Sequence, residues 1–254
     1  MLVPIAFVFA ACGGQLDTKA SVDTKGNYTA SSMDEFNTAL DDQTELASQT
    51  GYRFTTDMNL SVKINSSTTN MKMLCNGILT QEEMAMKVSV DAMGESIKSE
   101  MYVKDSTLYT HSDAIWQNGI EVQKEIKSKQ TITSINSAFD NEYASLAGEM
   151  KDVQSFLDLI KNDENAEVTK SGTNYCVKVQ DMEAGGVFEL SNVKIYFNFD
   201  AENNLVAVGL VADASMSMTS DAQDMAFNGT AVFAISAFEG QIQFPDFSGY
   251  AEMS

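Results

Sequence analysis

Residues 54–64 read FTTDMNLSVKI, and this stretch decides the fold. Its apolar side chains, Met58, Leu60 and Val62 among them, occupy even positions, and polar side chains occupy the odd positions between them. Successive side chains of a β-strand point to opposite faces, so this alternation predicts a strand with one apolar face and one wet face.

The same two-residue period recurs on both sides of the middle of the chain. It is present in residues 71–75, 84–90, 97–103, 175–179, 193–199, 205–212 and 225–237. Turn-forming stretches such as Met93-Gly94-Glu95 and the hairpin loop 200–204 separate these segments. The first group predicts an antiparallel meander. Since no Gly/Pro/Ser-rich linker interrupts residues 31–254, both groups can belong to one sheet in a single domain.

Two segments carry helical patterns. Ser32 and Glu35 match a capping box, which predicts a helix from there to about Thr50. Residues 148–162 carry an apolar stripe at helical spacing, which ends at Ile160, and residues 126–147 are a weaker candidate for a further helix or two. Strands and helices in separate runs predict an α+β fold.

The beginning of the chain resembles an export signal. Residues 2–11 form an uncharged apolar run that ends in small residues before Cys12, as in a bacterial lipobox. We therefore expect a signal peptide over 1–11, a lipidated Cys12 that anchors the protein to the cell membrane on its outer side, and a flexible tether over 12–30. No Lys or Arg precedes Cys12, which suggests a start codon further upstream. The alternative is a buried N-terminal strand with a core cysteine.

The charge balance excludes several classes of protein. The 254 residues include 36 acidic and 16 basic side chains, for a net charge of −20. Nucleic-acid binding needs clustered Lys and Arg, so it is not expected. The single His111 rules out multi-histidine metal sites, and a catalytic triad on His111 and its neighbour Ser112 would need two adjacent strand residues to share one site. We expect a monomeric, non-enzymatic protein without metal or cofactor.

The whole layout resembles the LolA-like lipoprotein superfamily, and most closely extracytoplasmic lipoproteins of the LppX and LprG kind and their Gram-positive relatives. The resemblance spans most of residues 31–250 and rests on Cys12, the Met-rich hairpins 71–103, the FNFDAENNL hairpin 197–205 and the IQFPD segment 242–246. It implies a strongly curved antiparallel half-barrel whose concave face is covered by helices. It also implies an apolar cavity between sheet and helices that holds acyl chains.

The apolar strand positions are the candidates for lining such a cavity. They are Phe54, Met58, Leu60, Met84, Met86, Val88, Met101, Phe197, Phe199 and Phe233. Methionine is unbranched and adapts to varied apolar ligands. The expected function is therefore binding of a lipid, an acyl chain or an apolar partner. The alternative is a structural or interaction lipoprotein of the cell envelope, in which these residues form a filled core and no ligand binds.

Sulfur-containing residues leave two further alternatives open. Cys75 and Cys176 could form a disulfide outside the cytoplasm or remain as buried free thiols. Pairs of methionines two apart, such as Met84 and Met86, could bind Cu(I), but apolar strand positions at period two explain them as well.

Overall fold

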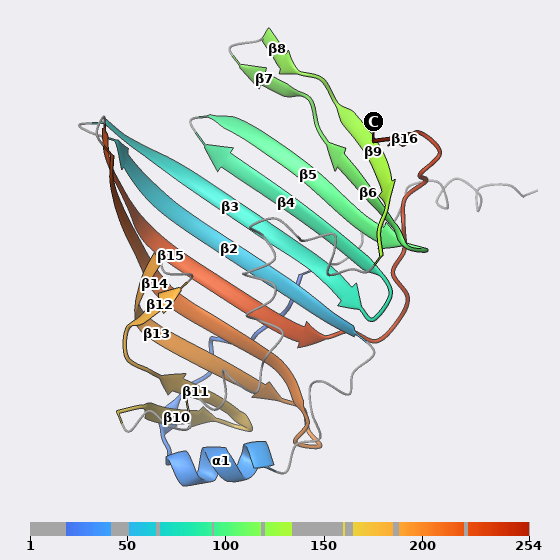
Figure 1. Ribbon diagram of the computed structural model, residues 1–254. Helices are drawn as coiled ribbons and strands as arrows, with labels where there is room; N and C mark the ends of the chain where they lie inside the picture. The colour runs from blue at the N-terminus through green and yellow to red at the C-terminus, as the bar shows by residue number, and fades with distance from the viewer. Residues whose placement is uncertain are drawn as a thin grey trace, which may run out of the picture.

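The computed structural model of the chain describes residues 19–41, 51–64, 67–92, 94–117, 120–133, 160, 165–184, 188–220 and 223–253. One large β-sheet dominates these residues (Figure 1). The elements are α1 Met33–Asp41, β1 Thr29–Ala30, β2 Gly51–Ile64, β3 Ser67–Thr80, β4 Met84–Ala92, β5 Glu95–Lys104, β6 Thr107–Ser112, β7 Ile115–Gln117, β8 Ile120–Gln123, β9 Ile126–Thr131, β10 Glu167–Ser171, β11 Asn174–Lys178, β12 Met182–Ala184, β13 Phe188–Phe199, β14 Leu205–Ser220, β15 Gln223–Ala237 and β16 Ala251–Glu252.

The sheet joins the two halves of the chain through its longest strands. Its order is β1-β10-β11-β13-β14-β15-β2-β3-β4-β5-β6-β9-β16, with β12 beside β13, and β7 and β8 form a separate hairpin. β15 pairs with β2 from Met225↔Ile64 to Ala237↔Tyr52. The predicted meander is confirmed from β2 to β6, and the predicted hairpin closes at Phe199↔Leu205.

The predicted α+β fold class, with helices covering a concave sheet face, is wrong. The part of the chain that the structure describes is almost all β, with one helix, and the sheet is mixed because β16 runs parallel to β9. α1 lies at one end of the sheet, near β10 and β11 (Figure 1). Residues 126–131, a candidate helix, form β9 instead. Of the predicted helix 148–162, only Ile160 is described, and it is completely buried.

The start of α1 follows the predicted capping box in part. The amide of Glu35 donates a hydrogen bond of 3.1 Å to Ser32 Oγ, which satisfies one of the free amides of the first turn. The Glu35 carboxylate accepts a hydrogen bond from Ser31 Oγ instead of returning to Ser32. Phe36 then anchors the helix, because its ring lies 4.8 Å from Phe197 and 5.5 Å from Tyr175, centre to centre.

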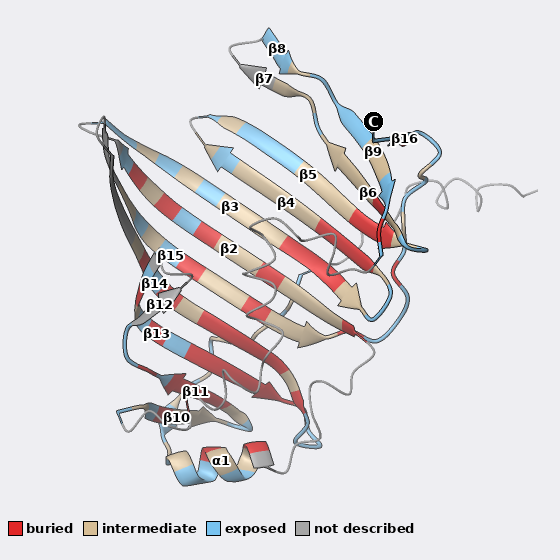
Figure 2. Ribbon diagram, viewed as in Figure 1, coloured by how far each residue is buried: buried red, intermediate tan, exposed pale blue. Residues whose placement is uncertain are grey.

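We call the side of the sheet that α1 contacts the apolar face. Strand register places the side chains of one row on this face across ten strands, from β11 to β9. The row is Tyr175, Phe197, Val208, Ile235, Phe54, Gly77, Met86, Met101, Thr110 and Ser128. It changes from apolar to hydroxyl-bearing at its β6 and β9 end, where Thr110 and Ser128 lie 2.6 Å apart, Oγ1 to Oγ. Figure 2 shows buried positions running through the central strands.

The opposite side of the sheet, which we call the strap face, is crossed by both ends of the described chain. The N-terminal strap, residues 19–28, has no strand partner of its own. The amide of Ala20 donates to Thr55 Oγ1 at 2.9 Å, and the amide of Asp23 donates to Asn198 Oδ1 at 2.6 Å. Thr55 and Asn198 are buried polar side chains, so they supply hydrogen-bond partners that the strap backbone would otherwise lack. Residues 19–28 belong to the segment expected to be a tether.

The C-terminal strap, residues 238–250, packs through aromatic rings. Phe247 stacks on Tyr109 with ring centres 3.8 Å apart and planes 9° apart, and it also contacts Tyr102 and Tyr250. Phe238 begins the strap, and the Arg53 guanidinium lies 4.8 Å above its ring. The buried aromatic rings of the strap form a second apolar layer on the strap face. In the expected fold, such a layer would have been formed by helices on the opposite face.

Each strap is continuous with a two-residue strand at one edge of the sheet. β1 follows the N-terminal strap and pairs with β10, and β16 follows the C-terminal strap and pairs with β9. Short strands at both edges limit the backbone groups that remain available for pairing with another chain.

Candidate functional site

The ten predicted cavity residues all belong to apolar-face positions, as the alternation predicts. Phe197, Phe54, Met86 and Met101 share the row given above, and Phe233 and Val88 share the neighbouring row. The sequence therefore identified the face, although it did not identify what covers it.

Two packed clusters occupy opposite ends of the apolar face. The first lies against α1 and includes Met58, Leu60, Phe197 and Phe199, with Phe233 at its border. The second includes Met84, with Met101 at its border. Between the clusters, on β2, β3 and β4, lies a set that we call the apolar band. It consists of Phe54, Cys75, Gly77, Met86 and Val88.

The apolar band is partly open. Phe54, Cys75 and Val88 are half-buried, whereas Met86 is 7% exposed. Gly77 has no side chain, and the Phe54 ring lies over it so closely that an added Cβ would overlap the ring. Of the two hollows described below, one contacts Leu60 and the other contacts Phe199, and neither contacts a residue of the band.

Of the two alternatives for Cys75 and Cys176, the structure has the free thiols and not the disulfide. Cys75 shares a row with Val177, so its side chain lies on the apolar face, whereas Cys176 points to the strap face. Five strand-to-strand steps separate the two cysteines, roughly 24 Å at ~4.8 Å per step. A disulfide needs Cα atoms closer than about 7 Å. Cys12 and the rest of the expected signal peptide lie outside the described residues.

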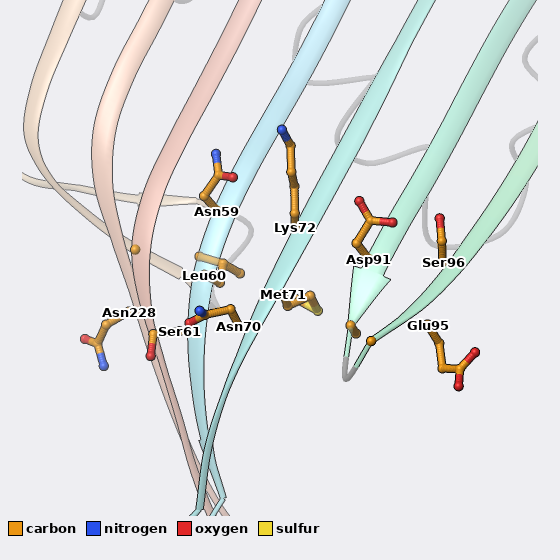
Figure 3. A pocket seen from close by; sticks show the side chains of 13 residues that line it. Asn59, Leu60, Ser61, Asn70, Met71, Lys72, Asp91, Glu95, Ser96 and Asn228 are labelled. Atoms are coloured by element: carbon orange, nitrogen blue, oxygen red, sulfur yellow. The ribbon is translucent and has the colours of Figure 1, made fainter. Parts of the chain in front are cut away.

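A second candidate site, which we call the polar hollow, lies at the outer ends of β15, β2, β3, β4 and β5. Its volume is about 780 Å³. Figure 3 shows the side chains of Asn59, Lys72, Asp91 and Ser96 pointing in the same direction from four neighbouring strands. The complete lining is Asn59, Leu60, Ser61, Asn70, Met71, Lys72, Asp91, Ala92, Gly94, Glu95, Ser96, Asn228 and Gly229.

A smaller hollow of about 310 Å³ lies between α1 and the sheet. Glu35 and Lys170 form an ion pair of 2.5 Å at this site, and the Lys170 ammonium lies 5.0 Å from the centre of the Tyr175 ring. Hydrogen bonds from Lys170 and Ser31 lower the pKa of the Glu35 carboxyl. The Glu35 carboxylate and the Lys170 ammonium are therefore already paired with each other at this hollow.

His111 lies on the strap face among three carboxylates. Its ring nitrogens lie 3.4 Å from Glu100, 2.8 Å from Glu125 and 3.5 Å from Asp113. Burial raises the pKa of the Glu100 carboxyl, but hydrogen bonds from Lys87, Tyr102 and His111 outweigh it and lower that pKa overall. These contacts form a polar network that includes the ion pair between Lys87 and Glu100. Within the described ranges, no three His, Cys, Asp or Glu side chains are grouped closely enough to hold a metal ion.

The residues of the polar hollow were missed in the sequence because they are the polar members of alternating strands. Asn59, Lys72 and Asp91 lie on the three consecutive strands β2, β3 and β4, and the alternation predicts only that they belong to a wet face. The grouping of these polar residues becomes visible only when the strands are aligned in their register. Asn59 pairs with Lys72, and Lys72 pairs with Asp91, so polar positions coincide across the sheet.

Comparison with known proteins leaves the family open. The chain matches no protein-family model and no curated protein sequence. The crystal structure of the ywiB protein from Bacillus subtilis aligns with 77% of this chain and with all of its own chain, at 4% identity and a TM-score of 0.19. A similarity at that level carries no conclusion about fold or function. No helix in the described segments is long and apolar enough to span a membrane.

Buried thiol and phenol groups predict a loss of stability at alkaline pH. Burial raises the pKa of Cys75 from 9.0 to about 11 and those of Tyr28 and Tyr196 from 10.0 to about 12. A raised folded-state pKa stabilises the fold fully below the unfolded-state pKa, and this stability is lost as the pH rises through the folded-state pKa. We expect the free energy of unfolding to fall between pH 9 and 12, as measured by urea denaturation.

A Cys75→Ala variant isolates the contribution of the Cys75 thiol to this loss of stability. Between pH 9 and 11, the free energy of unfolding of this variant should fall by about 2–3 kcal/mol less than that of the parent. The reason is that the pKa of Cys75 rises from 9.0 to about 11, and one unit of pKa corresponds to about 1.4 kcal/mol. Parallel pH profiles for the two proteins would contradict the assignment of this effect to Cys75.

Proposed function

We propose that this chain is a lipid-anchored, extracytoplasmic, non-catalytic protein that binds an apolar ligand, a lipid or acyl chain, along the apolar band. The observation that carries the proposal is the partial burial of Phe54, Cys75 and Val88 between two packed clusters on one sheet face. The lipobox-like sequence before Cys12 supports the anchor. The LolA-like resemblance supports the ligand class.

The chemistry of the band suits a flexible chain better than a rigid ring. Met86 is unbranched and can change rotamer to follow a ligand, whereas the Phe54 ring fills the space above Gly77. Burying one methylene contributes about 0.8 kcal/mol. About ten buried methylenes would match the 8.2 kcal/mol of a roughly micromolar Kd before association costs are subtracted.

The two free thiols provide an internal test of this proposal. Cys75 lies in the band, and Cys176 lies on the opposite face. The full chain is alkylated with iodoacetamide with and without palmitate, and each cysteine is followed by peptide mass spectrometry. We expect palmitate to slow the alkylation of Cys75 several-fold and to leave Cys176 unchanged. Equal Cys75 rates with and without palmitate would support the filled-core interaction lipoprotein instead.

A pair of matched variants separates binding from general destabilisation. Val88→Lys places a charge in the band, whereas Val232→Lys places the same charge on the strap face, because Val232 pairs with Asp57 on β2. Both valines are half-buried. Protection of Cys75 by palmitate should disappear in Val88→Lys and persist in Val232→Lys. Loss of protection in both variants would contradict a site on the band.

A further inference from the structure

The polar hollow has a regular internal pattern that the apolar-ligand proposal does not explain. Its strap-face side chains form two rows across the strands. The outer row runs Asn228, Ser61, Asn70, and the inner row runs Asn59, Lys72, Asp91, Ser96. Neighbouring strands are ~4.8 Å apart and the two rows are separated by two residues, or ~6.6 Å, so polar groups repeat on a grid.

The hollow is open at the turn between β4 and β5. Gly94 of this turn contributes no side chain, and nothing lies within 4 Å of the position that its Cβ would take. Leu60 and Met71, between the two rows, point their side chains to the apolar face, so the floor there is sheet backbone. The volume of 780 Å³ falls in the usual range of ligand sites, roughly 300–1,000 Å³.

The lining is suited to hydroxyl groups in particular. The carboxamides of Asn59, Asn70 and Asn228 each carry two N–H donors and one acceptor oxygen. The hydroxyls of Ser61 and Ser96 each donate one hydrogen bond and can also accept. One amide is already in use, since Asn59 Nδ2 donates to Asp57 Oδ1 at 3.0 Å. All seven row residues except the half-buried Ser61 are exposed, so their polar groups are accessible to a ligand.

The charge of the hollow favours a neutral ligand. Lys72 lies directly opposite Asp91 in the register, and Glu95 is the one further charged residue of the lining. The lining therefore carries a net charge of −1, which is small beside the −20 of the whole chain. A polyanion would be repelled by the protein as a whole, and a polycation would find few carboxylates in the hollow.

We propose that the polar hollow is a binding site for a neutral oligosaccharide, whose repeated hydroxyls match the repeated amides and hydroxyls of the two rows. A free oligosaccharide and an envelope glycan share this chemistry. The site lies on the opposite face of the sheet from the apolar band, so it is independent of the proposed lipid site.

Maltohexaose and chitohexaose are suitable probes, because both are neutral and one carries N-acetyl groups. Each is titrated into the ¹⁵N-labelled full chain. We expect at least one to shift the backbone amides of residues 59–61 and 70–72 with a Kd in the millimolar range, and soluble peptidoglycan fragments to compete if the natural source is an envelope glycan. Binding by neither probe, or shifts confined to other strands, would overturn the proposal.

Variants locate the site within the hollow. The double variant Asn70→Ala/Asn228→Ala removes two amides from the outer row. It should weaken binding roughly tenfold, because the loss of each amide weakens it about threefold. Gln130→Ala removes an exposed strand amide outside the hollow and serves as the control. Equal affinity in both variants would exclude this site. Saturation with either probe should leave the Cys75 alkylation rate unchanged, which separates this result from the lipid proposal.

Discussion

Replacing Gly229 by Ala is expected to destabilise the protein by about 3 kcal/mol or more, because overpacked sites of this kind cost 1–3 kcal/mol and sometimes more. A Cβ at Gly229 would overlap the carbonyl oxygen of Asn59 on the neighbouring strand, and also contact the Cα of Leu60. These are backbone atoms, which cannot rotate away. The affected pairing, β15 with β2, is the one that joins the two halves of the chain.

Urea denaturation of Gly229→Ala beside Gly249→Ala measures this effect. Gly249 lies in the C-terminal strap, and nothing lies within 4 Å of the Cβ position there. Its variant should stay within about 0.5 kcal/mol of the parent. If Gly229→Ala does not fold, Gly249→Ala still shows that the loss is local to the β15–β2 contact. Equal stability of the two variants would show that β15 and β2 can move apart without cost.

Replacing Phe36 by Ala should cost about 3–5 kcal/mol, which is the usual range for a fully buried phenylalanine. Phe36 is 0% exposed and contacts Phe197 and Tyr175, so its removal leaves a cavity between α1 and the sheet. We expect loss of α1 from the sheet before global unfolding. Faster hydrogen exchange in residues 33–41 than in β13 would reveal it.

Thr38→Ala is the matched control in the same helix. Thr38 is exposed, and its hydroxyl donates only to the carbonyl of Asp34 within α1. We expect a change within about 0.5 kcal/mol. A comparable loss in both variants would mean that helix propensity, and not docking of Phe36, holds α1 in place.

The strands were predictable from sequence because their two-residue period is local. β2 and β15 keep apolar residues on one face for most of their length, so the pattern predicts each strand, but it does not predict that they pair or in which register. β9 was missed, because its sequence IKSKQT carries one apolar residue, Ile126, and that residue is exposed. Its place in the sheet comes from pairing with β6, which no local pattern reports.

The covering layers were not predictable for the same reason. The straps have no regular period, and their contacts join residues far apart in the chain, as between Asp23 and Asn198. The sequence pointed to helices as the cover, whereas aromatic residues such as Phe247 cover part of the strap face. The candidate apolar residues were placed on the right face, but the polar hollow depends on the register of several neighbouring strands.

The edge strands have a consequence for synthesis. β1 pairs with β10 through residues separated by 141 positions, and β16, almost the last described segment, pairs with β9. A nascent chain that has not yet released its C-terminal strap therefore presents Ser128 and Lys129 of β9 as an open edge. Such intermediates are the species that recruit chaperones. We expect the pairing of β16 with β9 to be the step that releases the chain from them.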